Sequence, residues 1–203
     1  MKSKSWLDRR LAHSAAPILL DGAIGTELER NGVPMDAMAW SATANLSHAE
    51  QVEQVHLSYL EAGVEVITTN TFSGSRLLLE PAGYGDQVTD INLSGIAIAL
   101  RAREQFPEQD IAIAGSLCEW VHTEASHWHQ PEVVHRCMGE QAQILVDAGV
   151  DILALEMCQQ LPYSLPSLEA IIDLGAPVWI GVSARRYPGC ESLGGFDFPD
   201  QDF

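Results

Sequence analysis

The chain has 203 residues, of which 46% are hydrophobic and 19% charged, a balance that can bury one core and predicts a single domain over residues 1–203. Its 11 basic and 28 acidic residues give a formal charge of -17, which repels phosphate backbones and anionic membrane surfaces, so we expect no nucleic-acid or membrane partner. No apolar run reaches the roughly 20 residues of a membrane helix, and the first residues lack an apolar signal segment, which predicts a cytoplasmic location.

Short apolar runs rich in β-forming residues alternate with longer amphipathic segments, a pattern typical of βα units in a parallel sheet. The predicted strands are Ile18–Asp21, Val64–Asn70, Ile111–Ser116, Ile152–Glu156 and Val178–Ser183. Five such units fit either an open doubly wound sheet or part of an eight-stranded barrel. No GxGxxG motif follows the first strand, so a dinucleotide site has little support.

The segments between the strands have helical periodicity. The first helix is predicted to begin at Ser47, which forms a capping box with Glu50, and to run to about Ala62, where Gly63 supplies a left-handed stop. The remaining predicted helices are about Asp86–Gln105, Pro131–Ala148 and Tyr163–Asp173. The sequence EAGVE at residues 61–65 recurs as DAGVD at residues 147–151, which predicts equivalent turns from helix to strand.

Polar residues stand at the carboxyl ends of the predicted strands, where α/β folds gather their functional groups. We expect Asp21, Thr69 and Glu156 to share one opening. Two carboxylates in such an opening suit a substrate with an ammonium group, because anions bind a cation most strongly where water is partly excluded. The structural alternatives are a helix cap for Asp21 and an ion pair for Glu156.

Four segments, in this order and spacing, resemble the homocysteine S-methyltransferase family: ILLDGAIGTELERNG, AWSATANLSHAEQVEQVHLSYLEAGVEVITTNTF, IAIAGSL and DILALEM. The resemblance covers Pro17 to about Gly195. It implies an α/β fold of the (β/α)8 TIM-barrel type. It also implies transfer of a methyl group from a donor, such as S-methylmethionine or betaine, to the thiol of homocysteine, which gives methionine.

The resemblance also implies roles for particular residues. Asp21 and Gly22 would contact the amino-acid end of homocysteine, Glu156 would bind its ammonium group, and Thr69 would line the pocket, with Asn70 a candidate of the same kind. A zinc ion would hold the substrate sulfur as a thiolate, because a free thiol with a pKa near 8.5 is mostly protonated at neutral pH.

The family holds its zinc with three cysteines, in an Asn-Cys element and a Gly-Gly-Cys-Cys element. Neither element occurs in this sequence, so we expect no metal ligands, an incomplete barrel of about five βα units without the C-terminal zinc-binding part, and impaired activity. Three explanations stay open: a piece of a longer enzyme, a shortened relative that closes its core as a homo-oligomer, or a rebuilt metal site.

A rebuilt site would use thiols and imidazoles near the predicted strand ends. These are Cys118, Cys158, Cys190, His122, His127 and His129. Their spacing matches no standard zinc pattern. In the same region the segment GSLCE at residues 115–119 departs from the family, which usually has a glycine-proline after the serine and one more small residue.

Three functions of different classes follow from these features. The first is a homocysteine S-methyltransferase. The second is a non-catalytic module of the same descent that binds an amino acid or oligomerises. The third is an unrelated barrel enzyme that uses Asp21 and Glu156 as an acid and base pair. The sequence contains no sugar-binding aromatic pattern that supports this third function.

Overall fold

The computed structural model describes residues 5–121, 125–189 and 193–197. The α-helices are α1 (Trp6–His13), α2 (Ile24–Arg30), α3 (Ala44–Ser47), α4 (Ala49–Glu61), α5 (Arg76–Leu79), α6 (Val88–Glu104), α7 (Pro131–Asp147) and α8 (Leu161–Ile171), and the 3-10 helices are η1 (Gly85–Gln87) and η2 (Ser126–His129). The strands are β1 (Val66–Thr68), β2 (Ala112–Cys118), β3 (Ile152–Cys158), β4 (Val178–Val182), β5 (Ala184–Arg186) and β6 (Leu193–Gly195). Within these ranges no helix is long and apolar enough to cross a membrane.

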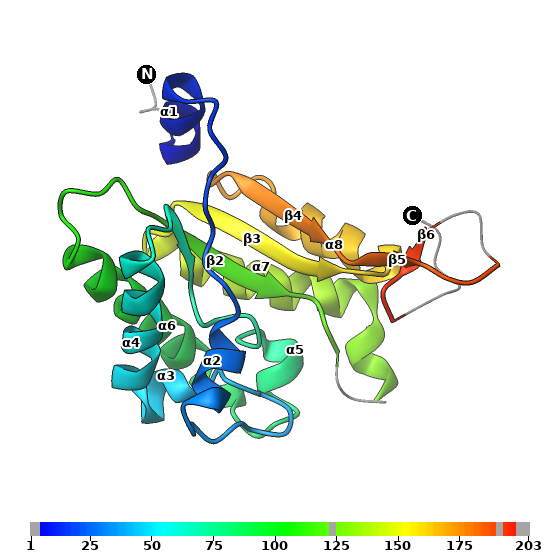
Figure 1. Cartoon of the computed structure of the whole chain (residues 1–203). Coiled ribbons are helices and arrows are strands. Elements are labelled where there is room, and N and C mark those ends of the chain that lie inside the picture. Colours follow the sequence, from blue (N-terminus) through cyan, green and yellow to red (C-terminus); the bar gives the residue numbers. More distant parts are fainter. Residues whose placement is uncertain (1–4, 122–124, 190–192, 198–203) are drawn as a thin grey trace.

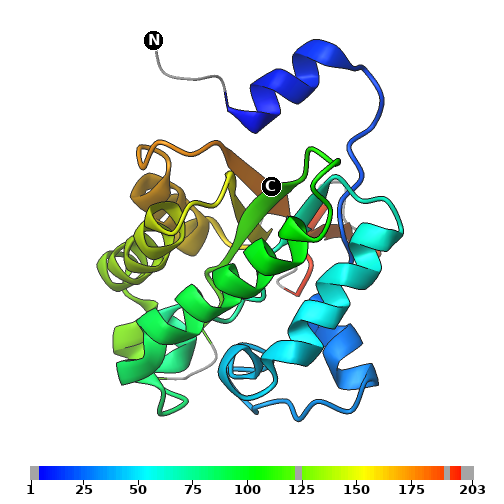
Figure 2. The ribbon, with the colours of Figure 1, turned by 90° about the vertical axis from the view of Figure 1, so that its left-hand side faces the viewer.

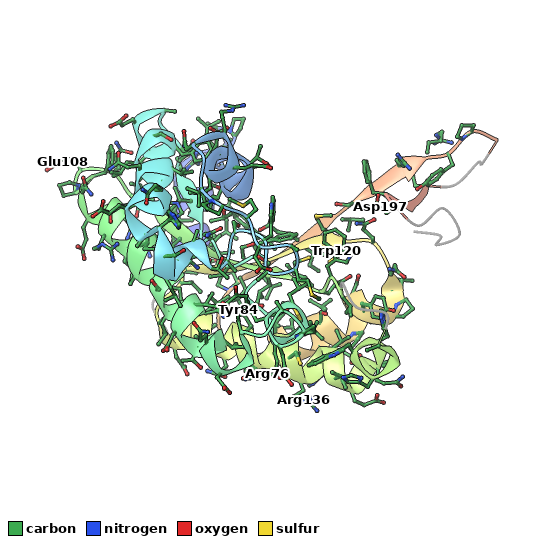
Figure 3. All side chains as sticks on the ribbon, turned by 90° about the horizontal axis from the view of Figure 1, so that it is seen from below. Arg76, Tyr84, Glu108, Trp120, Arg136 and Asp197 are labelled. Atoms are coloured by element: carbon green, nitrogen blue, oxygen red, sulfur yellow. The ribbon has the colours of Figure 1, made fainter. Side chains whose placement is uncertain are left out.

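The central sheet has the order β1-β2-β3-β4, with every neighbouring pair parallel (Figure 1). These strands confirm four of the five predicted runs. The prediction of a strand at residues 18–21 was wrong, since that segment forms only an isolated bridge between Leu20 and Val66. The pair of β5 and β6, which was not predicted, is antiparallel and forms an arm, carrying Asp197 just beyond β6, that extends away from the helices (Figure 3).

The two faces of the sheet are covered differently. Side chains of one face, such as Ile67, Ile113 and Leu155, pack in the largest core cluster against helices α4, α6, α7 and α8. Alternate residues, such as Ala114, face the other way, and there α1 contributes Trp6 (Figures 1 and 2). A doubly wound sheet would carry its crossover helices on both faces. Crossover helices on one face alone are typical of a barrel wall.

The recurring sequences at residues 61–65 and 147–151 form the same turn. Gly63 has φ +90 and Gly149 has φ +92, the left-handed conformation that ends a helix without a Cβ clash. The predicted equivalence of the two turns is confirmed.

The acidic residues that close these two turns also act alike. Glu65 accepts hydrogen bonds of 2.5 and 3.1 Å from Arg10, and Asp151 accepts one of 3.0 Å from Arg103. Each acid also accepts a backbone N–H from the preceding βα unit. Glu65 therefore ties α1 and Leu19 to the start of β1, and Asp151 ties α6 and β2 to the start of β3. Both contacts lie at the end of the sheet opposite the predicted opening.

The predicted capping box at Ser47 was wrong. Helix α4 begins at Ala49, its N-cap is His48, and no side chain caps it. Ser47 instead ends α3, and its hydroxyl donates to the Thr43 carbonyl at 3.0 Å. The Ser47 hydroxyl can either bond the preceding turn or cap the following helix, and here it bonds the preceding turn. The sequence pattern alone does not decide between the two. The later helices agree with their predicted ranges to within two residues, and the 3-10 helix η1 directly precedes α6.

Candidate functional site

The carboxyl ends of β1, β2 and β3 and the loop that precedes α2 surround a cavity of about 200 Å³. Its lining includes Gly22, Trp40, Thr69, Asn70, Ser116 and Glu156. Four of the five residues predicted from the sequence therefore lie together.

Asp21, the fifth, is not among the lining residues, but it is hydrogen-bonded to Thr68, which is. Its Oδ2 accepts the backbone N–H of Thr68 at 2.7 Å and the Thr68 hydroxyl at 3.1 Å. The pKa of Asp21 is raised to about 7, because burial and, to a smaller extent, the negative charge of Glu156 outweigh the hydrogen bonds from Thr68 that lower it. The two carboxylates are thus close enough to interact.

Glu156 is held by the hydroxyl of Ser116, which donates to Oε1 at 2.5 Å. Burial raises the pKa of Glu156, and the Ser116 hydrogen bond lowers it. Two carboxyl groups of like charge in a partly buried opening repel each other when both are ionised. A ligand with positive charge would relieve that repulsion.

Thr69 belongs to a closed set of hydrogen bonds with Ser116 and Thr71. The Thr71 hydroxyl donates to the Ser116 carbonyl at 2.8 Å, so the 2.6 Å contact between the two threonines must be donated by Thr69. Thr69 Oγ1 in turn accepts the Ser116 backbone N–H at 3.1 Å. The single hydroxyl hydrogen of Thr69 is therefore used inside the protein.

The Asn70 side chain is also occupied by the protein. Its Nδ2 donates to the Ser41 carbonyl and to Asn45 Oδ1, each at 2.8 Å, and its Oδ1 accepts the Ser41 hydroxyl at 2.8 Å. Asn70 thus ties the end of β1 to the segment that enters α3.

Gly22 lies where the chain passes closely over an aromatic ring. A Cβ on Gly22 would stand 2.6 Å from the hydroxyl oxygen of Tyr59, which explains the glycine at this position. Two larger residues of the cavity have left-handed backbone, Trp40 with φ 46 and Met157 with φ 57. Such strain gathers at functional sites.

The sequence prediction missed Trp40, Met157 and the role of Ser116. Ser116 is the last residue of the predicted strand Ile111–Ser116, and this position at a strand end could have indicated a role in the site. Trp40 and Met157 carried no such signal, because their backbone conformations follow from tertiary packing.

The described residues do not fit a zinc ion. Among them, no group of three or more His, Cys, Asp or Glu side chains could hold a metal. Cys118 and Cys158 end β2 and β3 in buried positions, and burial raises the pKa of both thiols, that of Cys158 to about 12.

The histidines proposed for a rebuilt site give no further ligand set. His129 Nδ1 lies 3.0 Å from the Tyr163 hydroxyl, and His127 stacks at a tilt on Trp128. His122 and Cys190 lie outside the described residues.

Comparisons with known proteins show what the whole chain is similar to. A family model described as homocysteine S-methyltransferase matches residues 18–195. Homocysteine S-methyltransferase 2 of Zea mays is 26% identical over 211 residues, which cover 90% of this chain and 59% of the relative. The homocysteine S-methyltransferase of Escherichia coli (strain K12) is 28% identical over 175 residues, with 77% and 54% covered. The chain thus spans somewhat more than half the length of these curated relatives.

Among solved structures, the metallated form of the homocysteine methyltransferase MmuM from Escherichia coli matches with a TM-score of 0.72 and 24% identity, over 86% of this chain and 65% of that one. The oxidised form matches with a TM-score of 0.73. This likeness concerns the fold. It confirms the expected α/β fold of the TIM-barrel type, of which the described strands and helices form a part.

Proposed function

This chain belongs to the homocysteine S-methyltransferase family, and from that premise we propose that its opening binds the amino-acid end of homocysteine for methyl transfer to the thiol. The observation that carries the proposal is that two partly buried carboxyl groups lie at one opening, Glu156 in its lining and Asp21 hydrogen-bonded to the lining residue Thr68. A positively charged ammonium group is the partner that such a pair favours.

In this proposal the site residues have different tasks. Glu156 binds the ammonium group directly, Asp21 adds negative charge beside it, and Gly22 lets the ligand approach the backbone. Thr69 and Asn70 support the pocket and do not donate to the ligand, because their hydrogens are already used.

The reaction joins a methyl group to the substrate sulfur and releases the proton of the thiol. In the family, zinc supplies the thiolate when bound. The described residues do not fit this ion, and the printed sequence contains neither of the family's cysteine elements. We therefore propose that the substrate pocket is present, while methyl transfer by these 203 residues alone is impaired.

Calorimetry with two ligands tests the pocket. Homocysteine carries the ammonium group, and 4-sulfanylbutanoate is the same molecule without it. We expect Glu156→Gln to weaken homocysteine by roughly 10- to 100-fold, as for the loss of a charged hydrogen-bond partner, and to leave 4-sulfanylbutanoate unchanged. The control is the exposed Glu108→Gln. Equal binding of both ligands to the unaltered chain would refute the proposal.

A methionine-formation assay with zinc and either S-methylmethionine or betaine tests the second part. We expect little or no turnover by this chain. Turnover at a rate ordinary for enzymes would show that the thiol is activated by residues outside the proposed set.

A homo-oligomer remains a prediction. The outer strand of the described sheet, β4, exposes Ile180 at 49% and Val182 at 56%. Apolar edge strands favour pairing with another chain. Sedimentation at several protein concentrations would measure the mass. A monomeric mass at every concentration would exclude the homo-oligomer.

A further inference from the structure

The segment that follows β1, residues 69–74, is held by three buried amide side chains, each from a different helix. They are Asn45 of α3, Asn92 of α6 and Gln141 of α7. None of the three is more than 1% exposed. Their amide groups donate to the backbone carbonyls of Asn70, Gly74 and Thr71, in that order, at 2.8, 2.8 and 2.7 Å. The helical layer therefore fixes the backbone of this segment.

Gln141 reaches the middle of the segment. Its Nε2 donates to the Thr71 carbonyl at 2.7 Å and to Asn92 Oδ1 at 3.1 Å, so both of its N–H hydrogens are used. Its Oε1 is buried and has no hydrogen-bond partner among the described residues, which costs stability. An apolar side chain of the same size would avoid this cost. The amide is therefore explained by what its N–H groups hold.

A glycine allows this close approach. A Cβ on Gly74 would stand 2.6 Å from Asn92 Oδ1 and 2.9 Å from Gln141 Nε2, so a larger residue would push both amides away. The Gly74 N–H also donates to the Thr71 carbonyl, at 2.8 Å. That carbonyl thus accepts two hydrogen bonds, one from the segment itself and one from α7.

Thr71 connects Gln141 to the homocysteine opening. The Thr71 hydroxyl donates to the Ser116 carbonyl at 2.8 Å and accepts the Thr69 hydroxyl at 2.6 Å. Thr69 in turn accepts the Ser116 N–H at 3.1 Å. Both backbone polar groups of Ser116 are therefore bound to this segment, and the Ser116 hydroxyl donates to Glu156 Oε1. The contacts form a continuous path from α7 to the carboxylate on β3.

We propose that Gln141 is a positioning residue for the Glu156 carboxylate. It fixes the Thr71 carbonyl, and through Thr71 and Ser116 it sets the direction in which Glu156 points. Gln141 is not among the residues that line the opening, so it acts through these contacts and not on the ligand. The ligand in this inference, the ammonium group of homocysteine, rests on the proposed function. The positioning itself can be measured without a ligand.

Calorimetry with homocysteine and 4-sulfanylbutanoate tests the effect on binding. Gln141→Met keeps the length of the side chain and removes both donors. We expect it to weaken homocysteine by about five- to tenfold and to change 4-sulfanylbutanoate by less than about twofold, because only homocysteine carries the ammonium group. The matched control is Gln143→Met, an exposed position on the same helix, which should change neither ligand.

A double-variant cycle separates positioning from a general loss of packing. In Glu156→Gln the carboxylate is already absent, so adding Gln141→Met should weaken homocysteine by less than about twofold more. The same loss in both backgrounds would mean that Gln141 acts independently of Glu156 and would overturn the proposal. An equal loss for the two ligands would do so as well. If Gln141→Met does not fold, Gln141→Leu takes its place in each measurement.

Amide hydrogen exchange measures the positioning with no ligand present. In Gln141→Met we expect the Gly74 and Ser116 N–H groups to exchange at least about tenfold faster, because their acceptors belong to the segment that Gln141 holds. The Ile113 N–H, which donates to Asp151 at the opposite end of the sheet, is the internal reference and should not change. Unchanged exchange at Ser116 would refute the positioning whether or not homocysteine binds. Faster exchange in a chain that does not prefer homocysteine would count against the proposed function alone.

Discussion

The Ser116 hydroxyl donates a 2.5 Å hydrogen bond to Glu156 Oε1, and the backbone of the same serine is fixed by Thr69 and Thr71. The orientation of the Glu156 carboxylate is therefore set by β1 and β2 before any ligand arrives. A binding group held in place in this way loses less conformational entropy when it binds.

Replacement of Ser116 should weaken the binding of an ammonium ligand. We expect Ser116→Ala to reduce homocysteine affinity by about 10-fold, since hydrogen bonds to charged groups contribute on the order of 1.5 to 3 kcal/mol and part of this acts through orientation alone. Calorimetry measures the change, with the exposed Ser47→Ala as the control. Unchanged affinity in a folded Ser116→Ala variant would show that Glu156 needs no such support.

Homocysteine binding should depend on pH through Asp21. Burial raises the pKa of Asp21 to about 7 in the free protein, and a bound ammonium group favours the ionised form. Below about pH 7 the ligand must therefore displace a proton, so affinity should fall as the pH falls from about 8 to 6, by up to about tenfold per unit. Asp21→Asn should flatten this profile.

Calorimetry in phosphate and in Tris detects the proton that binding releases, because the two buffers differ in ionisation enthalpy. Equal heats in both buffers near pH 7 would contradict the role given to Asp21.

The buried imidazole of His56 should make the fold sensitive to acid. His56 is fully buried without a hydrogen-bond partner among the described residues, and burial lowers its pKa from 6.5 to about 4. The unfolded chain thus binds a proton at a higher pH than the folded chain does. The stability contribution is present above pH 6.5 and is lost as the pH falls toward 4.

In His56→Leu this contribution disappears. The unaltered chain should lose free energy of unfolding when the pH falls from about 7 to 5. We expect His56→Leu to lose about 2 kcal/mol less over the same range, as measured by urea unfolding. The exposed His135→Leu is the control. The same pH dependence in both variants would rule out His56 as its source.

The Glu65 carboxylate should stabilise the fold more than an exposed ion pair does. Its partner Arg10 is 14% exposed at the side chain, and Glu65 also accepts the Leu19 N–H. We expect Glu65→Ala to lower the free energy of unfolding by about 1 to 3 kcal/mol. Glu53→Ala, which breaks the more exposed pair with Arg101, should cost about 0 to 1 kcal/mol in the same urea titration. Equal costs would mean that Glu65 does not anchor α1.

The sequence by itself determined the parallel βα organisation and which polar groups meet at one end of the sheet. Strand periodicity and the repeated turns at Gly63 and Gly149 are local properties, so they could be read from neighbouring residues. Because the carboxyl ends of parallel strands share one edge, the positions of Thr69, Ser116 and Glu156 at one opening followed from the sequence, whereas Asp21 reaches that edge through an isolated bridge between Leu20 and Val66.

Tertiary structure decided how each of these groups is used. The Asn70 amide donates to partners 25 and 29 residues away, and Thr69 must donate to Thr71 because the Thr71 hydroxyl donates to Ser116, 45 residues further along the chain. No local pattern encodes such contacts. The contact of Gln141 with the Thr71 carbonyl likewise joins two distant segments, 70 residues apart. The hydrogen bonds and desolvation that set the character of each group act through space, and only the folded chain brings their sources together.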